Sequence, residues 1–501
     1  MLNHLRFLWQ YRQNRFTHAI ATVNHRQSRR EARKKLWAMY QLNMYRSVAR
    51  QPAKPSCWRT SLAKAVSLAA CGEINAAREI VTSFQKQHTR FRQRMALVKG
   101  LAPFMPQDAL MLLEGLPKAP PAMHIALLLR NGHLAQARSM VEQLPSNIVE
   151  IDPELLLMQT NTFNSTPEIQ LQRLNNFLQT HSLPPLSLVN SSLAPSPLNL
   201  RAAKVTEARS GPLISVLMTT YNTGYRAEVA ISSILAQSYQ SLELIIVDDA
   251  SSDDTPERLE RLARRDNRIT LLRLPRNVGT YAAKRIGLAQ AKGDFVTCHD
   301  SDDWCHPEKL SRQLAPMLSD STIVCTVSNW VRMQDDGVFY ARPVYPLTRL
   351  NPASPLFRRE QVIRKAGAWD CVRTGADSEF LARLKLVFGT KAIKKVNQPL
   401  TLGSHRPDSL MTSMSTGYTH MGVSPQRQKY WEAWSQWHID SLAAGKKPYI
   451  DNAVPLTSDR PFEVPVSLLV DPEALADCMK VLNPSYVFDI AEKETNKIEF
   501  A

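Results

Sequence analysis

The sequence contains no long uncharged hydrophobic run, although 44% of its 501 residues are hydrophobic. A helix that crosses a bilayer needs about 20 mainly apolar residues, so we expect no membrane-spanning helix. The N-terminus also lacks the pattern of a secretory signal. Arg6, Arg12 and Arg15 interrupt its apolar residues, and no small-residue cleavage site follows. We therefore expect no export signal there.

Cysteine is scarce and shows no pairing pattern. The seven cysteines are scattered, their number is odd, and none belongs to a Cys-x-x-Cys motif. This usage favours a reducing compartment and argues against a zinc ribbon or a disulfide scaffold. The expected location is cytoplasmic.

Acidic residues are nearly absent from residues 1–60, where Glu31 accompanies thirteen Lys and Arg residues. This basic arm therefore carries +12 of the net charge of +17, and Arg26 to Lys35 is its densest part. Basic helices with interleaved aromatic residues often lie on anionic membranes. We expect peripheral contact with the inner face of the cytoplasmic membrane, with nucleic acid as the least favoured partner. The alternative is a solvated helix face whose aromatic residues pack on the next domain.

The next segment, residues 61–180, has apolar residues at helical spacing. Ala77, Ala109 and Ala137 stand at similar places in three related phrases, 32 and 28 residues apart. That period resembles tetratricopeptide-type helical hairpins, which could bind a protein partner. A plain helical bundle is the alternative. Residues 181–212 are rich in Pro and Ser and predict a linker.

From residue 213 the pattern changes to alternating strands and helices, and we assign 213–445 to one α/β domain. Such alternation implies βαβ units and a mostly parallel sheet. Residues 446–501 form a C-terminal extension without a recognisable motif. The expected strands are 213–221, 242–247, 269–274 and 295–299, and the expected helices are 228–237, 256–265, 280–291 and 307–318.

Polar residues follow four of the expected strands, and ligands of parallel sheets bind at the carboxyl ends of strands. Their convergence predicts a phosphate or nucleotide site. The residues are Thr220, Tyr221 and Asn222; Asp248 and Asp249; Asn277; and Asp300, Ser301, Asp302 and Asp303.

The three acids between 300 and 303 need compensation, because like charges a few Å apart repel. A divalent cation is the usual compensation, and oxygen ligands suit Mg²⁺ or Mn²⁺, which often share substrate phosphates. The alternative is a solvated turn that caps the next helix. The sequence thus predicts a metal-assisted phosphate site or an ordinary turn.

Taken together, these motifs resemble the family 2 glycosyltransferases, which have the GT-A fold, over about residues 213–410. One position departs from the family pattern: Ala376 stands where a Glu usually precedes the catalytic Asp. The working carboxylate is therefore Asp377 or Glu379. The matching motifs are Thr220-Tyr221-Asn222, Asp248-Asp249-Ala250-Ser251, Asn277-Val278-Gly279 followed by Lys284-Arg285, and Asp300-Ser301-Asp302-Asp303.

The resemblance implies a metal-dependent, inverting transfer of a sugar from a nucleoside diphosphate sugar, with UDP-sugar as the expected donor. Asp377 would be the base that accepts the acceptor proton, and the metal ligands would be Asp302, Asp300 and His405. Trp304, Trp369 and Glu379 are acceptor-site candidates. The donor-site candidates are Thr220, Tyr221, Asn222, Asp248, Asp249, Asn277, Lys284, Arg285, Asp300 and Ser301.

The acceptor implied is a saccharide or a lipid-linked saccharide, as in bacterial surface polysaccharide synthesis. Two other classes remain open from the sequence. A nucleotidyl or alditol-phosphate transferase would share the strand-end acids, and it would release a nucleoside monophosphate. A helical-repeat scaffold with a degenerate transferase domain would have no turnover at all.

Overall fold

The computed structural model describes residues 2–23, 28–52, 56–145, 147–203, 207–407, 409, 412–413, 416–419, 422–451 and 460–482. Among these residues, no helix combines the length and the apolar character that a bilayer crossing requires. Arg26 of the basic arm, and residues 452–459 and 483–501 of the predicted extension, lie outside the described residues.

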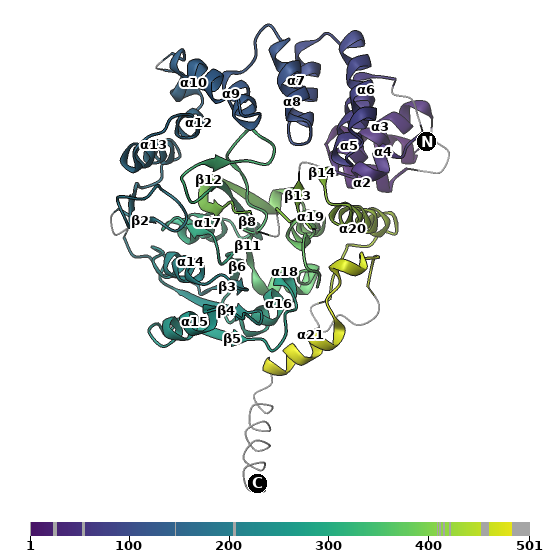
Figure 1. The fold of residues 1–501 in the computed structure, drawn as a ribbon. Helices are drawn as coiled ribbons and strands as arrows, with labels where there is room; N and C mark the ends of the chain where they lie inside the picture. Colours follow the sequence, from purple (N-terminus) through teal and green to yellow (C-terminus); the bar gives the residue numbers. More distant parts are fainter. Residues whose placement is uncertain are drawn as a thin grey trace, which may run out of the picture.

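Helices make up the N-terminal part and arch over one side of the sheet domain (Figure 1). Neighbouring helices pack in pairs: α5 with α6, α7 with α8, α9 with α10 and α12 with α13. Ala77, Ala109 and Ala137 are completely buried in α6, α8 and α10, as helices that approach closely require. The bounds are α1 Leu2–Arg12, α2 Phe16–Ala21, α3 Arg29–Gln41, α4 Tyr45–Ala49, α5 Trp58–Ala70, α6 Ile74–Gln87, α7 Phe91–Leu101, α8 Pro106–Glu114, α9 Pro121–Arg130, α10 Leu134–Glu142, α11 Ile148–Ile151, α12 Glu154–Thr162 and α13 Pro167–Thr180.

The segment predicted as a linker packs against the rest of the chain. Strands β1 (Leu186–Leu188) and β2 (Leu200–Ala202) pair antiparallel. Leu183, Leu186 and Leu200 are buried in the core that the N-terminal helices share with the sheet. The described part of residues 181–212 therefore holds a fixed position beside α13.

The main sheet confirms the predicted α/β fold class, because it is a mixed sheet preceded by an all-helical region. Its strand order is β5-β4-β3-β6-β11-β8-β12-β7, with β9 and β10 paired to β8. Strands β3 to β6 are parallel in the order β5-β4-β3-β6. The bounds are β3 Ile214–Thr220, β4 Leu242–Asp248, β5 Ile269–Arg273, β6 Phe295–Cys298, β7 Trp304–Cys305, β8 Cys325–Met333, β9 Phe339–Tyr340, β10 Arg349–Leu350, β11 Leu356–Arg358 and β12 Ile393–Ser404.

Both faces of the central strands are covered, which is why these strands read as continuous apolar runs. Alternate side chains of β3 enter two cores, Val216 and Met218 on one face and Leu217 on the other. This packing fixes the carboxyl ends of β3, β4 and β6 at one edge. The helices of this domain are α14 Tyr225–Leu235, α15 Thr255–Ala263, α16 Thr280–Gln290, α17 Lys309–Ser319, α18 Arg359–Ala366, α19 Ala376–Phe388, α20 Pro425–Ala443 and α21 Pro472–Met479.

Helix α20 joins the helical part to the sheet domain, because it packs on both α2 and α19. Its Glu432 accepts hydrogen bonds from the backbone N–H groups of Arg46 (2.6 Å) and Ser47 (3.0 Å) at the start of α4. Its Trp431 donates to the carbonyl of Leu42 at 2.7 Å. Close by, a short hairpin of β13 (Tyr418–Thr419) and β14 (Gly422–Val423) contacts α5.

A buried carboxylate makes a second polar junction. Glu154 of α12 accepts hydrogen bonds from the backbone N–H groups of Leu347 (2.6 Å) and Thr348 (2.8 Å). Since an unpaired buried carboxylate is costly, these bonds hold α12 in one place on the sheet domain.

Candidate active site

The ends of β3 and β4 form one connected loop structure. Asn222, at a positive φ of 51°, donates its backbone N–H to the hydroxyl of Ser251 at 2.9 Å, and its side-chain oxygen accepts from Ser252 N–H at 2.8 Å. The Thr220 hydroxyl pairs with that of Thr223. The ring of Tyr221 is left 50% exposed, as a platform for a planar ligand would be.

Asp248 and Asp249 are both buried at the end of β4. Asp249 accepts from the backbone N–H groups of Val278 (2.7 Å) and Gly279 (2.8 Å), and Asn277 donates to its carbonyl at 3.1 Å. Burial raises the pKa of Asp249 to about 6, against the effect of those bonds. Asp249 therefore orders the loop that carries Asn277, which brings two predicted donor-site motifs together.

Lys284 stands between two carboxylates at the centre of the site. Its buried Nζ lies 3.4 Å from Asp300 Oδ1 and 3.8 Å from Asp377 Oδ1. Burial favours the neutral amine, but Asp377 and Asp300 raise the pKa of Lys284 well above its usual value. The sequence prediction that these three residues share one site is consistent with this geometry.

Tyr281 is a site residue that the motifs did not identify. Its hydroxyl donates to Asp377 Oδ2 at 2.7 Å. Burial raises the pKa of Asp377, while Lys284 and the Tyr281 hydrogen bond act in the opposite direction. Tyr281 precedes Lys284 by three residues, which places both on one face of α16, and that spacing is the signal that could have identified it.

The other two acids of the 300–303 segment have separate partners. Asp302 Oδ2 lies 3.0 Å from Arg406 Nε, and Asp303 Oδ1 accepts from Ser404 N–H at 2.8 Å. Burial raises the pKa of Asp302 and, together with the Asp302 charge, raises that of Asp303. The repulsion between the clustered acids is thus relieved partly by cations of the chain itself. Ser301, between them, is buried.

In the part of the chain that the structure describes, no three His, Cys, Asp or Glu side chains gather at metal-binding distances. The side chains of Asp300 and Asp302 are partly exposed, at 39% and 21%. They fit a divalent ion that takes one or two carboxylates and completes its coordination with water and substrate phosphates.

His405 lies flat on Tyr340, with ring centroids 3.6 Å apart and planes within 2°. Burial, and then the charges of Arg332 and Arg130, lower the pKa of His405 to about 4. Its buried Nδ1 has no hydrogen-bond partner among the described residues. His405 is therefore a neutral imidazole, and it is adjacent in sequence to Arg406, the residue that pairs with Asp302.

Arg285 and Trp369 turn away from the strand ends. The Arg285 guanidinium donates to the carbonyls of Trp369 (3.0 Å) and Asp451 (2.6 Å). The Trp369 ring is buried against Phe357 and Phe380. Both predicted site residues lie in the core behind the site, so the geometry does not bring either to a ligand.

Glu379 is enclosed in a structural ion pair. Its carboxylate accepts from Arg383 Nε and Nη2, both at 2.8 Å, and lies 3.0 Å from His438. Although burial favours protonation, Arg383 lowers the pKa of Glu379 to about 2. The geometry favours Asp377 over Glu379 as the carboxylate that faces substrate.

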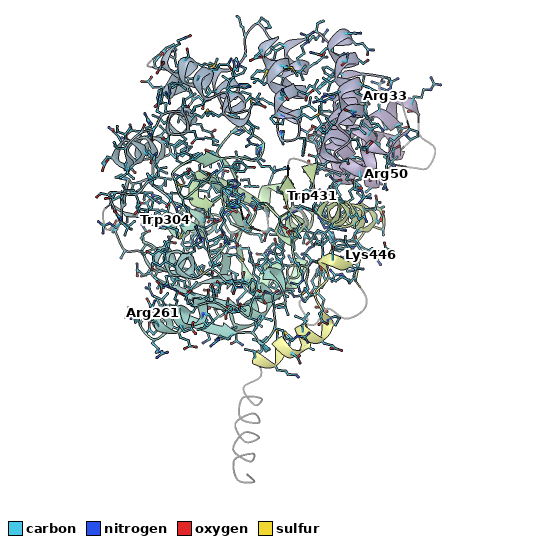
Figure 2. All side chains as sticks on the ribbon, viewed as in Figure 1. Arg33, Arg50, Arg261, Trp304, Trp431 and Lys446 are labelled. Carbon is cyan, nitrogen blue, oxygen red and sulfur yellow. The ribbon has the colours of Figure 1, made fainter. Side chains whose placement is uncertain are left out.

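Trp304 is buried where β7 pairs with β12. It borders a cavity of about 390 Å³ between α14, α15 and the β1–β2 segment, and Figure 2 shows it on the same side of the sheet domain as Arg261. The acids described above do not line that cavity. Its polar and aromatic lining residues are Arg201, Tyr225, Glu228, Ser232, Ser233, Arg261, Arg265 and Trp304.

Comparison with known proteins connects this site with a family. Residues 215–375 match the model of "Glycosyl transferase family 2". Over 126 residues the chain is 42% identical to an uncharacterized glycosyltransferase of Haemophilus influenzae, which covers 25% of this chain and 50% of that protein. Over 109 residues it is 38% identical to UDP-Glc:alpha-D-GlcNAc-diphosphoundecaprenol beta-1,3-glucosyltransferase WfgD of Escherichia coli, covering 22% of this chain and 42% of that protein.

The chain thus spans half or less of the length of these curated relatives. Among solved structures, Staphylococcus aureus TarS 1-349 in complex with UDP-GlcNAc aligns with 20% identity and a TM-score of 0.35. That alignment covers 46% of this chain and 65% of the TarS chain.

Proposed function

We propose that this chain, whose residues 215–375 form a family 2 glycosyltransferase domain, transfers a sugar from a nucleoside diphosphate sugar to an acceptor hydroxyl with inversion. The observation that carries the proposal is the placement of Lys284 between Asp300 and Asp377 at the strand ends. In this proposal, Asp300 serves the donor phosphates and Asp377 serves the acceptor hydroxyl.

On the donor side, the exposed Tyr221 ring can stack on the base, and the loops held by Asp248 and Asp249 surround the ribose. A bound Mg²⁺ or Mn²⁺ at Asp302 and Asp300 would neutralise the charge that develops on the diphosphate as the glycosidic bond breaks. Lys284 adds a fixed positive charge next to the same phosphates. We expect a UDP-sugar, because the WfgD relative is named for a UDP-Glc donor.

On the acceptor side, Asp377 is the proposed general base. It is partly exposed, at 18%, so an acceptor hydroxyl can reach it. Because burial raises the pKa of Asp377, its carboxylate is a stronger base than an ordinary aspartate. Tyr281 fixes one oxygen of the carboxylate and leaves the other beside Lys284. Attack by a hydroxyl from this side, without an enzyme nucleophile, inverts the anomeric centre.

For the acceptor we propose a saccharide or a lipid-linked saccharide in bacterial surface polysaccharide synthesis, which the name of the WfgD relative supports. The basic arm would hold the enzyme on an anionic membrane. Leu5 and Trp9 of α1 are 58% and 53% exposed, and the exposed Arg6 and Arg12 lie on the same helix. Exposed apolar side chains beside arginines are the pattern of interfacial helices.

The experiment that tests this function is a screen of nucleotide sugars for thermal stabilisation, with and without Mn²⁺, since a bound ligand raises the melting temperature. The stabilising sugar is then incubated with candidate acceptors. Release of a nucleoside diphosphate and an inverted anomeric configuration by NMR would support the proposal. Release of a nucleoside monophosphate would instead identify a nucleotidyl or alditol-phosphate transferase. Absence of stabilisation and turnover with every nucleotide sugar would favour a non-catalytic scaffold.

A further inference from the structure

A small cavity lies where the helical part, the β13–β14 hairpin and α20 meet. Its volume is about 60 Å³. One buried water occupies at least about 10–15 Å³ by this measure, so the cavity has room for several waters or for one phosphate or carboxylate group. Its lining residues are Asn43, Tyr45, Arg342, Tyr418, Val423, Arg427, Gln428 and Trp431.

Two arginines contact the same tyrosine ring at this cavity. The guanidinium carbon of Arg342 lies 4.0 Å from the ring centroid of Tyr418, and that of Arg427 lies 5.0 Å from it. Although burial raises the pKa of the Tyr418 hydroxyl, Arg342 and Arg427 together lower it below its usual value. Two guanidinium groups therefore border one small cavity, which gives its lining a positive charge.

Among the described residues, no carboxylate lies within 4.0 Å of Arg342 or Arg427. Arg427 uses its Nε on the carbonyl of Thr416 at 2.6 Å, and Arg342 makes ring contacts with Tyr418 and Phe104. Two adjacent cations without an acid are unfavourable when partly buried, and a bound anion would remove that cost.

A hydrogen bond links one residue that lines this cavity to the turn before the proposed base. Arg427 Nη2 donates to the hydroxyl of Thr374 at 2.5 Å, and Thr374 is three residues before Asp377 in the turn that starts α19. The charge of Arg427 also opposes the burial that raises the pKa of Asp377. A ligand group held by Arg427 would thus lie on the acceptor side of the site.

We propose that Arg342 and Arg427 bind an anionic group, a phosphate or a carboxylate, on the acceptor. This inference rests on the proposed function, and it narrows the acceptor to a charged saccharide or a saccharide phosphate. Guanidinium groups suit such anions because their N–H donors match the oxygen geometry. Tyr45 and Trp431 line the same cavity.

Inorganic phosphate is the probe, titrated by calorimetry into the full chain with UDP and Mg²⁺ already saturating the donor site. We expect the wild type to bind phosphate and Arg342→Gln to bind it about 10- to 100-fold more weakly. Arg427→Lys keeps the charge and should show a smaller loss. Arg92→Gln, an exposed arginine of α7, is the matched control and should bind phosphate like the wild type.

The same variants are titrated with UDP. Unchanged phosphate affinity in Arg342→Gln, or no phosphate binding by the wild type, would overturn the inference. An equal loss of UDP affinity would also overturn it, because the arginines would then serve the donor. If UDP fails to bind the wild type while Arg342→Gln still abolishes phosphate binding, the anion site stands and the proposed function fails.

Discussion

Asp377→Asn should remove sugar transfer while leaving nucleotide binding intact. An asparagine can still accept the hydrogen bond of Tyr281, and Lys284 keeps Asp300 as a partner at 3.4 Å, so the site should hold its shape. Loss of a general base slows catalysis by about 10²- to 10⁴-fold, which is about 2.7–5.4 kcal/mol of activation free energy. The assay measures kcat for transfer and, separately, the dissociation constant of UDP with Mn²⁺.

Glu379→Gln is the matched comparison, because it makes the same change two residues away on the same helix. It leaves the buried Arg383 without a counter-charge, and breaking a buried ion pair costs about 3–5 kcal/mol. A domain of this size loses about 2–4 °C in Tm per kcal/mol, so we expect a fall of roughly 6–20 °C. The fraction that remains folded at low temperature should retain its kcat.

The reverse pattern would refute the assignment. If Asp377→Asn keeps near-normal turnover and Glu379→Gln is folded but inactive, Glu379 is the base and the buried ion pair must open during catalysis. Circular dichroism at the assay temperature separates lost chemistry from lost folding.

Three further outcomes follow from the site and the arm. Asp302→Asn should abolish the Mn²⁺-dependent gain in UDP affinity measured by calorimetry, and an undiminished gain would place the metal elsewhere. Tyr281→Phe removes a hydrogen bond that lowers the pKa of Asp377; since the base works when deprotonated, the acid limb of kcat/KM should move to higher pH, and an unmoved limb would contradict this role. Replacing Leu5 and Trp9 by serine should weaken co-sedimentation with anionic vesicles, with thermal stability as the control, and unchanged binding would exclude α1 as the contact.

The sequence predicted that these polar residues lie together, because parallel strands end at a common edge. The polar residues after β3 and β4 are joined by the Asn222 and Ser252 hydrogen bond. Lys284 on α16 contacts Asp300, which follows β6. Strand ends and their polar residues are set by local pattern, so a single sequence was enough to place them together.

The side-chain directions on helices could not be predicted in the same way. Lys284 and Arg285 are neighbours, yet successive helical residues point about 100° apart, and only Lys284 faces the acids. Asp377 and Glu379, two residues apart, point to nearly opposite sides, one to the site and one to Arg383. Which helix face turns toward the candidate site depends on packing with residues that are distant in the sequence. Glu154 illustrates this, because its partners Leu347 and Thr348 lie nearly 200 residues away.

The shared core of the helical arch and the sheet has a practical and an evolutionary consequence. Val331, Met333 and Leu400 of the sheet belong to the same hydrophobic cluster as Leu127 and Phe177 of the helices. A fragment that began at residue 213 would expose these hydrophobic side chains of the sheet to water, and it would be prone to aggregate. Replacing the N-terminal helices with those of a related enzyme would likewise require matching substitutions on the sheet domain. We therefore expect the residues on the two sides of this shared core to change together during evolution.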